Sequence, residues 1–167
     1  RKISETLVYL GCYSDQESNG ILILKLNEND SSLNYLNGVS GISNLSFITL
    51  SKDLLYLYSV NEVDDFNNSI SGGEVAFALE SGRSSLKILN MQSSFGIGPY
   101  HLSLDHKVKH LFVVNYGSGS ISMYPLNKDG SLGECSDFHQ HEGASVNPDR
   151  QEGPHAHTIQ VSTDNCF

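Results

Sequence analysis

The sequence predicts an all-β protein built from a repeated unit of short strands, and three observations support this fold class. Apolar runs of four to seven residues, rich in Val, Ile, Tyr and Phe, recur along the chain and often alternate with polar residues. Polar turn signals separate these runs, and no window of helical length has an amphipathic period of 3.6 residues. The third observation is an internal repeat, which decides the architecture because each copy must fold in the same way.

The first half of the repeated unit is clearest in the middle of the chain. Residues 47–62 align with residues 101–116 without a gap, and each segment contains two apolar runs that we predict as strands. Residues 8–13 resemble the later part of this segment, residues 57–62, and residues 159–162 begin the pattern again. The chain therefore enters the repeat partway through one copy and starts a further copy near its end.

The second half of the unit repeats as well. Residues 20–26 align with residues 73–79 and, more loosely, with residues 121–126. Each run is followed by a polar turn and a Ser-Leu pair, found at Ser32-Leu33, Ser85-Leu86 and Ser131-Leu132. A unit of about 50 residues with four short antiparallel strands has the period of a β-propeller blade.

The number of units predicts an incomplete ring. The chain contains the end of one blade, two fuller blades and the first strand of another, whereas a propeller closes with roughly four to eight blades. Arg1 stands where an initiating Met would be expected, and Phe167 falls inside a predicted strand. We therefore interpret residues 1–167 as one partial β-propeller domain, truncated at both ends or at least at the C-terminus.

Composition restricts the class of partner. Ten Lys and Arg residues against 19 Asp and Glu give a formal net charge of -9, which leaves no extended basic face for nucleic acid or an anionic membrane. No apolar run approaches the roughly 20 residues needed to cross a bilayer. Cys12, Cys135 and Cys166 form an odd set without a close pair, which favours reduced thiols. We expect a cytoplasmic protein and make no prediction of its oligomeric state.

Four ordered motifs carry a resemblance to a known family. They are GPYHLSLD at residues 98–105, VNYGSGS at 114–120, NKDGSLG at 127–133 and NPDRQEGPHAH at 147–157. This succession resembles the lactonase family of seven-bladed β-propellers, which includes the bacterial type of 6-phosphogluconolactonase and is related to fungal carboxy-muconate cyclases. Cys12 departs from the family pattern, where a small hydroxyl residue is common, and residues 164–167 interrupt a usual Asp-Gly turn.

The resemblance implies an enzyme that hydrolyses a sugar lactone. The expected reaction converts 6-phosphogluconolactone to 6-phosphogluconate in the oxidative pentose phosphate pathway, with a small-molecule lactone or phosphosugar as partner. Such chemistry requires neither a cofactor nor a metal ion. The family site is central and draws on several blades, so about three of seven blades supply only part of it.

Lactone hydrolysis needs an activated water, a stabilised oxyanion and a positive group for an anionic substrate, and residues 150–157 offer candidates. We assign His157 as the general base and His155 as a residue that orients the loop or binds substrate. Arg150 is the candidate clamp for a phosphate or carboxylate, and Gln151 is a hydrogen-bonding partner for sugar hydroxyls. If this segment is extended, the two imidazoles point to opposite sides and at most one faces the site.

Three further candidates for substrate binding follow predicted strands. Glu62, Asn115 and Tyr116 occupy corresponding strand ends in successive units, so they should open onto one face of a propeller. A purely structural role competes with this interpretation, because Asn61 and Asn115 could close turns through side-chain hydrogen bonds and Tyr116 could pack between blades.

Other functions remain open on the sequence alone. The same fold could serve as a non-catalytic binding scaffold, or the polar residues could catalyse a muconate-type lactonising cyclisation. The chain could also be a shortened product without activity. A metal site formed by His139, His141, Glu142 and the two later histidines is disfavoured, because the spacing matches no known ligand pattern.

Overall fold

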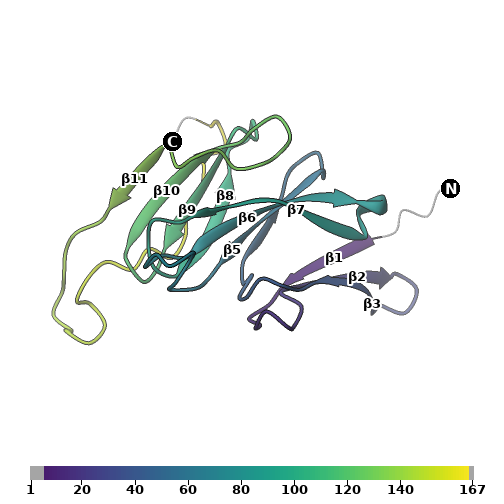
Figure 1. Cartoon of the computed structure of the whole chain (residues 1–167), viewed down its shortest axis with the longest axis horizontal. Helices are drawn as coiled ribbons and strands as arrows, with labels where there is room; N and C mark the ends of the chain where they lie inside the picture. The colour runs from purple at the N-terminus through teal and green to yellow at the C-terminus, as the bar shows by residue number, and fades with distance from the viewer. Residues whose placement is uncertain (1–5, 166–167) are drawn as a thin grey trace.

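Three antiparallel β-sheets lie side by side in the computed structural model, which describes residues 6–165 (Figure 1). A single short 3-10 turn, η1 (Ser81–Arg83), is the helical element of this part of the chain. The strands are β1 (Thr6–Gly11), β2 (Ile21–Asn27), β3 (Ser32–Val39), β4 (Ile48–Leu50), β5 (Tyr56–Asn61), β6 (Gly73–Glu80), β7 (Ser85–Ser93), β8 (Pro99–Leu104), β9 (His110–Asn115), β10 (Ser120–Pro125) and β11 (Asp137–Gln140).

Each sheet is formed by strands that follow one another in the chain. The orders are β1-β2-β3, then β4-β5-β6-β7, then β8-β9-β10-β11, and every neighbouring pair is antiparallel. Four-stranded meanders placed next to one another are the blades of a β-propeller. The predicted all-β propeller architecture is therefore confirmed for the described residues, with two four-stranded blades and a three-stranded one.

The internal repeat extends to a backbone irregularity. The register between β2 and β3 shifts between Ile23 and Leu24, and the register between β6 and β7 shifts between Ala76 and Phe77. These positions coincide when residues 20–26 are aligned with residues 73–79. A β-bulge bends a strand and increases its twist, so both blades acquire the same curvature at the same point.

Two clusters of buried residues hold the blades together. Ile21 of β2 packs with Leu57, Val75 and Phe77 of the middle sheet, which joins the first two sheets. On the other side of the middle sheet, Tyr58, Val60 and Ala76 pack with residues of the third sheet. Those partners are Leu102, Leu111, Val113, Tyr124 and Leu132.

Alternation explains how one sheet serves both clusters. Leu57 and Tyr58 are adjacent in β5, and side chains of adjacent strand residues point to opposite faces. Both are fully buried, one in each cluster. The middle blade is thus covered on both faces, and β5 is an apolar run rather than a one-sided alternating strand.

The strand predicted for residues 159–162 does not form, and that prediction was wrong. In the other blades the first strand pairs with the second strand of the same blade, as β4 does with β5 and β8 with β9. The described residues contain no strand after β11 that could pair with this segment as a second strand. It lies instead along the third sheet, where the Ile159 backbone N–H donates to Nδ1 of His101 over 3.4 Å.

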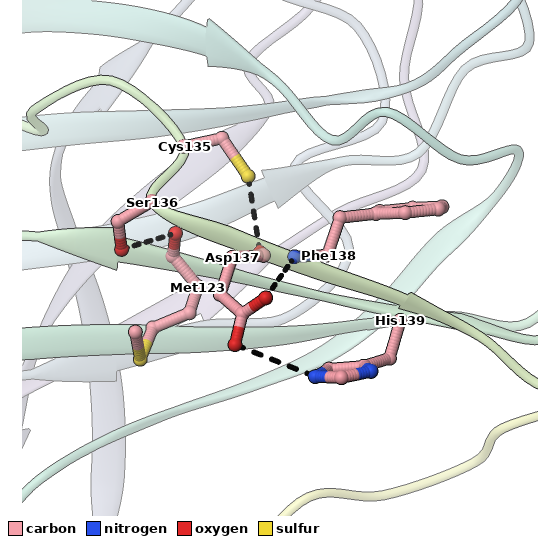
Figure 2. A network of polar contacts seen from close by, with 6 residues as sticks. All are labelled: Met123, Cys135, Ser136, Asp137, Phe138 and His139. Carbon is pink, nitrogen blue, oxygen red and sulfur yellow. Dashed lines mark hydrogen bonds and ion pairs between the residues drawn. The ribbon is translucent and has the colours of Figure 1, made fainter.

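Two of the three thiols lie within the described residues, and both Cys12 and Cys135 are free. Cys166 lies outside those residues. Figure 2 shows that Cys135 Sγ donates to the carbonyl oxygen of Asp137 over 3.2 Å at the start of the outer strand β11. Across residues 6–165 there is no helix that has both the length and the apolar character to span a membrane.

Candidate active site

The second strands of the three blades end at one edge, and each is followed by a polar residue at the same repeat position. These residues are Tyr13 after β1, Glu62 after β5 and Tyr116 after β9. The hydroxyl of Ser46 donates to Oε2 of Glu62 over 2.5 Å, which fixes the carboxylate in a half-buried position. Desolvation and a hydrogen bond to Glu62 raise the pKa of Tyr13 to about 12. The Tyr13 phenol therefore stays protonated and donates to Glu62.

A tight turn after β9 prepares the place where the histidine segment lies. The backbone N–H of Gly119 donates to the carbonyl of Asn115 over 2.9 Å, and Gly119 has a φ of +64°. A Cβ atom on Gly119 would lie 2.1 Å from the carbonyl oxygen of Pro154. Glycine is required here for both its positive φ and its lack of a side chain, because the backbone before His155 passes directly over it.

Both candidate histidines contact Tyr116. The His155 ring stacks on the Tyr116 ring with centroids 4.7 Å apart and an interplanar angle of 25°, and the His157 ring meets it edge-on at 4.8 Å and 72°. We expected at most one imidazole to face a common site if this segment were an extended strand, and that condition is not met. Residues 155–158 are irregular coil, so the alternation of an extended strand does not apply.

Hydrogen bonding distinguishes the two imidazoles. Nδ1 of His155 lies 3.0 Å from the carbonyl oxygen of Tyr116, so this nitrogen carries the proton and donates. Nε2 of His155 lies 3.3 Å from Oε1 of Glu152, which is a second acceptor. Both nitrogens of His155 therefore lie beside acceptor oxygens, while the ring stacks on Tyr116.

His157 has a different environment. Within residues 6–165 its ring makes no hydrogen bond, and its side chain is exposed beside Tyr116 and Tyr100. A ring nitrogen of His157 is thus available to accept a proton from water, whereas those of His155 are occupied. The arrangement suits His155 to hold the segment in place and His157 to act on a bound molecule.

Asn115 does not lie on this face, although we predicted it there. Its side chain is fully buried, and Nδ2 donates to the carbonyl of Ser94 over 3.2 Å and to Oγ of Ser120 over 3.0 Å. Asn61, at the equivalent repeat position, donates to the carbonyl of Ser43 over 2.6 Å. Both asparagine side chains hydrogen-bond to the loop that precedes the first strand of their own blade. This agrees with the alternative, raised in the sequence analysis, that these residues have a structural role.

Arg150 and Gln151 lie in an exposed turn that precedes the histidines. The backbone N–H groups of both residues point to the carbonyl oxygen of Asn147, at 3.3 Å and 2.8 Å. Oε1 of Gln151 accepts a hydrogen bond from the Asn147 N–H over 3.1 Å, so part of this side chain stabilises the turn. The described residues show no side-chain partner for the Arg150 guanidinium.

The other histidines lie elsewhere. His139 is on the outer strand β11, where Nε2 is 3.4 Å from Oδ2 of Asp137 and both side chains are well exposed (Figure 2). His106 Nε2 contacts the carbonyl of Ser162 at 2.9 Å, at a turn after β8. No group of three or more His, Cys, Asp or Glu side chains is placed for metal binding in the part of the chain that the structure describes.

Four residues of this site escaped the sequence analysis: Tyr13, Ser46, Tyr100 and Glu152. Tyr13 carried a usable signal, because it aligns with Glu62 and Tyr116 in the repeat. Tyr100 and Glu152 fall within two of the quoted motifs, residues 98–105 and 147–157, but a motif match does not show which of its residues face the site, and Ser46 lies just before the repeated segment. Their roles depend on how loops of different blades approach one another.

Comparison with known proteins places this geometry in a family. The family model described as "Lactonase, 7-bladed beta-propeller" matches residues 7–167. A 6-phosphogluconolactonase of Formosa agariphila is 30% identical over 161 residues, which is 96% of this chain and 45% of the relative. A 6-phosphogluconolactonase of Bacillus subtilis is 29% identical over 149 residues, or 89% of this chain and 41% of the relative.

Solved structures agree. The periplasmic gluconolactonase PpgL of Pseudomonas aeruginosa superposes with a TM-score of 0.84 at 27% identity, covering 96% of this chain and 45% of that one. The chain therefore spans less than half the length of the relatives it matches. Because the family model covers almost every residue, the chain belongs to the lactonase family of seven-bladed β-propellers.

Proposed function

We propose that the complete protein hydrolyses a sugar lactone, with 6-phosphogluconolactone as the specific substrate and 6-phosphogluconate as the product. The observation that carries this proposal is the pair of histidines held against Tyr116 at the edge where the second strands end. The names of the Formosa and Bacillus relatives support the choice of substrate. With that substrate, the protein would act in the cytoplasmic oxidative pentose phosphate pathway.

In the proposed reaction, His157 acts as general base. A water molecule attacks the lactone carbonyl carbon while a ring nitrogen of His157 takes its proton. The tetrahedral oxyanion then collapses, the ring C–O bond breaks, and the proton passes to the departing ring oxygen, which becomes a hydroxyl group. The product is an open-chain hydroxy acid, and atoms balance without a cofactor.

The neighbouring residues have supporting roles. His155, bonded through both nitrogens, positions the segment that carries His157. The Glu62 carboxylate and the Tyr13 phenol oxygen offer acceptors for sugar hydroxyl groups at the same edge. Arg150 supplies a guanidinium for the substrate phosphate. Arg150 is exposed and has no ion-pair partner within the described residues, so its fork is available to an anion.

The decisive experiment compares two exposed histidines. The variants His157→Ala and His139→Ala are assayed in the full-length protein with glucono-1,5-lactone and with 6-phosphogluconolactone, each corrected for spontaneous hydrolysis. Loss of a general base lowers kcat by about 10² to 10⁴, so His157→Ala should lose turnover while His139→Ala retains it. Full activity in His157→Ala would refute the assignment, and no activity in the wild type would refute lactone hydrolysis itself.

The phosphate assignment needs its own comparison. We expect Arg150→Gln to raise KM for 6-phosphogluconolactone by about tenfold and to leave KM for glucono-1,5-lactone unchanged, because only the first substrate carries the phosphate. Equal effects on both substrates would contradict a role for Arg150 in phosphate binding. Conversion of a muconate in place of either lactone would favour the cyclase alternative.

A further inference from the structure

Tyr100 lies at an irregular point in the third sheet. Pro99 pairs with Asn115 and His101 pairs with Val114, so Tyr100 has no partner residue in β9. This is a β-bulge, and bulges beside functional sites redirect a side chain away from the regular alternation. The Tyr100 side chain is 42% exposed, whereas Leu102 in the same strand is buried. The bulge therefore turns a large aromatic ring outward.

The ring is turned toward the candidate base. The centroids of Tyr100 and His157 are 5.2 Å apart, with the rings nearly perpendicular at 86°. The Tyr116 ring is 5.8 Å from Tyr100, but one of its faces is covered by His155. Of the two tyrosines that contact His157, Tyr100 is the more exposed one.

Among the described residues, the Tyr100 ring has no role in the buried core. The Tyr100 ring packs into neither of the two core clusters, and its hydroxyl makes no hydrogen bond within the described residues. Tyr13, on the same edge, is also 67% exposed. Exposed aromatic side chains grouped beside polar groups are typical of ligand-binding surfaces.

The chemistry of a lactone ring matches such a surface. A sugar lactone carries its hydroxyl groups around the edge of the ring and C–H groups on its faces. The face of a phenol ring is electron-rich and attracts C–H groups, while the hydroxyl groups stay free to bond with polar neighbours. A linear dicarboxylate lacks such a face, and its negative charges would be repelled by the electron-rich ring.

We propose that Tyr100 is the stacking surface for the sugar ring, and that it holds the ring beside His157 and selects cyclic lactones over linear acids. This inference rests on the proposed function and deepens it by assigning a specificity-determining residue. The stacking contact belongs to substrate binding, so its loss should raise KM more than it lowers kcat.

The test uses the full-length protein and glucono-1,5-lactone as substrate. Tyr100→Phe keeps the aromatic face and should stay within about twofold of the wild type. Tyr100→Leu and Tyr100→Ala remove it, and each should raise KM roughly tenfold, as expected for loss of one aromatic contact. Tyr35→Ala is the matched control, because Tyr35 is an exposed strand tyrosine, 58% accessible, in the first sheet.

A second measurement reports binding without turnover. The probe is glucono-1,5-lactam, which is not hydrolysed, observed by saturation-transfer NMR. In the wild type and Tyr100→Phe we expect strong transfer to the ring C–H protons, and in Tyr100→Leu we expect loss of that transfer. Circular dichroism of each variant checks that the sheets are retained.

The outcomes separate this inference from the proposed function. If the wild type hydrolyses the lactone and Tyr100→Leu leaves both KM and lactam binding unchanged, stacking by Tyr100 is overturned while lactonase activity stands. If the wild type hydrolyses no lactone but binds the lactam through Tyr100, the sugar subsite is supported and the proposed reaction fails. If the wild type neither hydrolyses lactone nor binds lactam, both are overturned.

Discussion

Replacing Gly119 by Ala tests whether the glycine turn positions the segment that carries the candidate histidines. The added Cβ would lie 2.1 Å from the Pro154 carbonyl oxygen, while an ordinary contact is at least 3.4 Å. The Pro154 backbone must therefore retreat by roughly 1 Å, which carries His155 and His157 away from Tyr116. A displacement of that size can lower the rate about 10²-fold.

The same substitution also has a conformational cost. Gly119 has a φ of +64°, and a residue with a Cβ in the left-handed region costs about 1 to 2 kcal/mol. We therefore expect Gly119→Ala to lower the free energy of unfolding by about that amount or somewhat more, and to lower kcat/KM for the lactone about 100-fold. Chemical denaturation and steady-state kinetics measure the two effects separately.

Two other glycines provide matched controls. Gly82 has a φ of +68° with no atom within 4 Å of an added Cβ, so Gly82→Ala should lose stability alone. Gly130 has a φ of +82° and a Cβ that would lie 2.2 Å from the Tyr56 ring, in the hairpin after β10. Gly130→Ala should therefore destabilise the protein without a specific loss of activity. If Gly119→Ala kept the activity of these controls, the proposed positioning of the histidines would be refuted.

Three further predictions concern buried and surface polar groups. Glu74 is fully buried, neither carboxyl oxygen has a hydrogen-bond partner among residues 6–165, and desolvation raises its pKa from 4.5 to about 8. The folded state favours the protonated form of Glu74. The contribution of Glu74 to the free energy of unfolding is therefore fully present below pH 4.5 and is lost as pH rises through 8. The free energy of unfolding should fall by at most about 5 kcal/mol between pH 4.5 and pH 8, and a persistent fall in Glu74→Gln would contradict this origin. Asn115→Ala removes a buried hydrogen-bond donor, so it should lower the free energy of unfolding by about 1 to 3 kcal/mol. The KM for the lactone should stay unchanged. A higher KM with unchanged stability would instead place Asn115 in the substrate site. Glu152→Gln removes the carboxylate contact of His155. Because the Glu152 side chain is 59% exposed, activity should fall less than about fivefold. A loss as large as that of His157→Ala would show that the carboxylate acts in the reaction.

The fold could be predicted from the sequence because its signals are local and repeated. Strands β5 and β9 follow from apolar runs, and their turns follow from Asp, Asn and Gly at fixed offsets. The failure at residues 159–162 has a non-local cause. A strand needs a hydrogen-bonded neighbour, and an apolar run does not reveal whether one is available.

The site was predictable only in part. His155, His157, Tyr116 and Glu62 occupy motif or repeat positions, and the structure brings both histidines together with Tyr116. The position of Asn115 could not be predicted in the same way, because an asparagine side chain can either contact a ligand or form a buried hydrogen bond to a loop backbone, as it does here with Ser94. Tyr100 depends on a bulge, and a one-residue register shift leaves no mark in the alternation of the strand.

The bulge shared by the β2–β3 and β6–β7 pairs bears on how this chain could diversify. The irregularity recurs at the same position of the repeat in the first two blades, so these two units share a backbone curvature as well as their strands. The paired residues of β10 and β11 in the third blade show no register shift. Blades with the same backbone place the residues at equivalent repeat positions on the same edge of the molecule, and this placement does not depend on the residue type. One such position holds Tyr in two blades, as Tyr13 and Tyr116, and Glu in the blade between them, as Glu62. New substrate preferences can therefore arise by single substitutions there, one blade at a time, without altering how the blades pack.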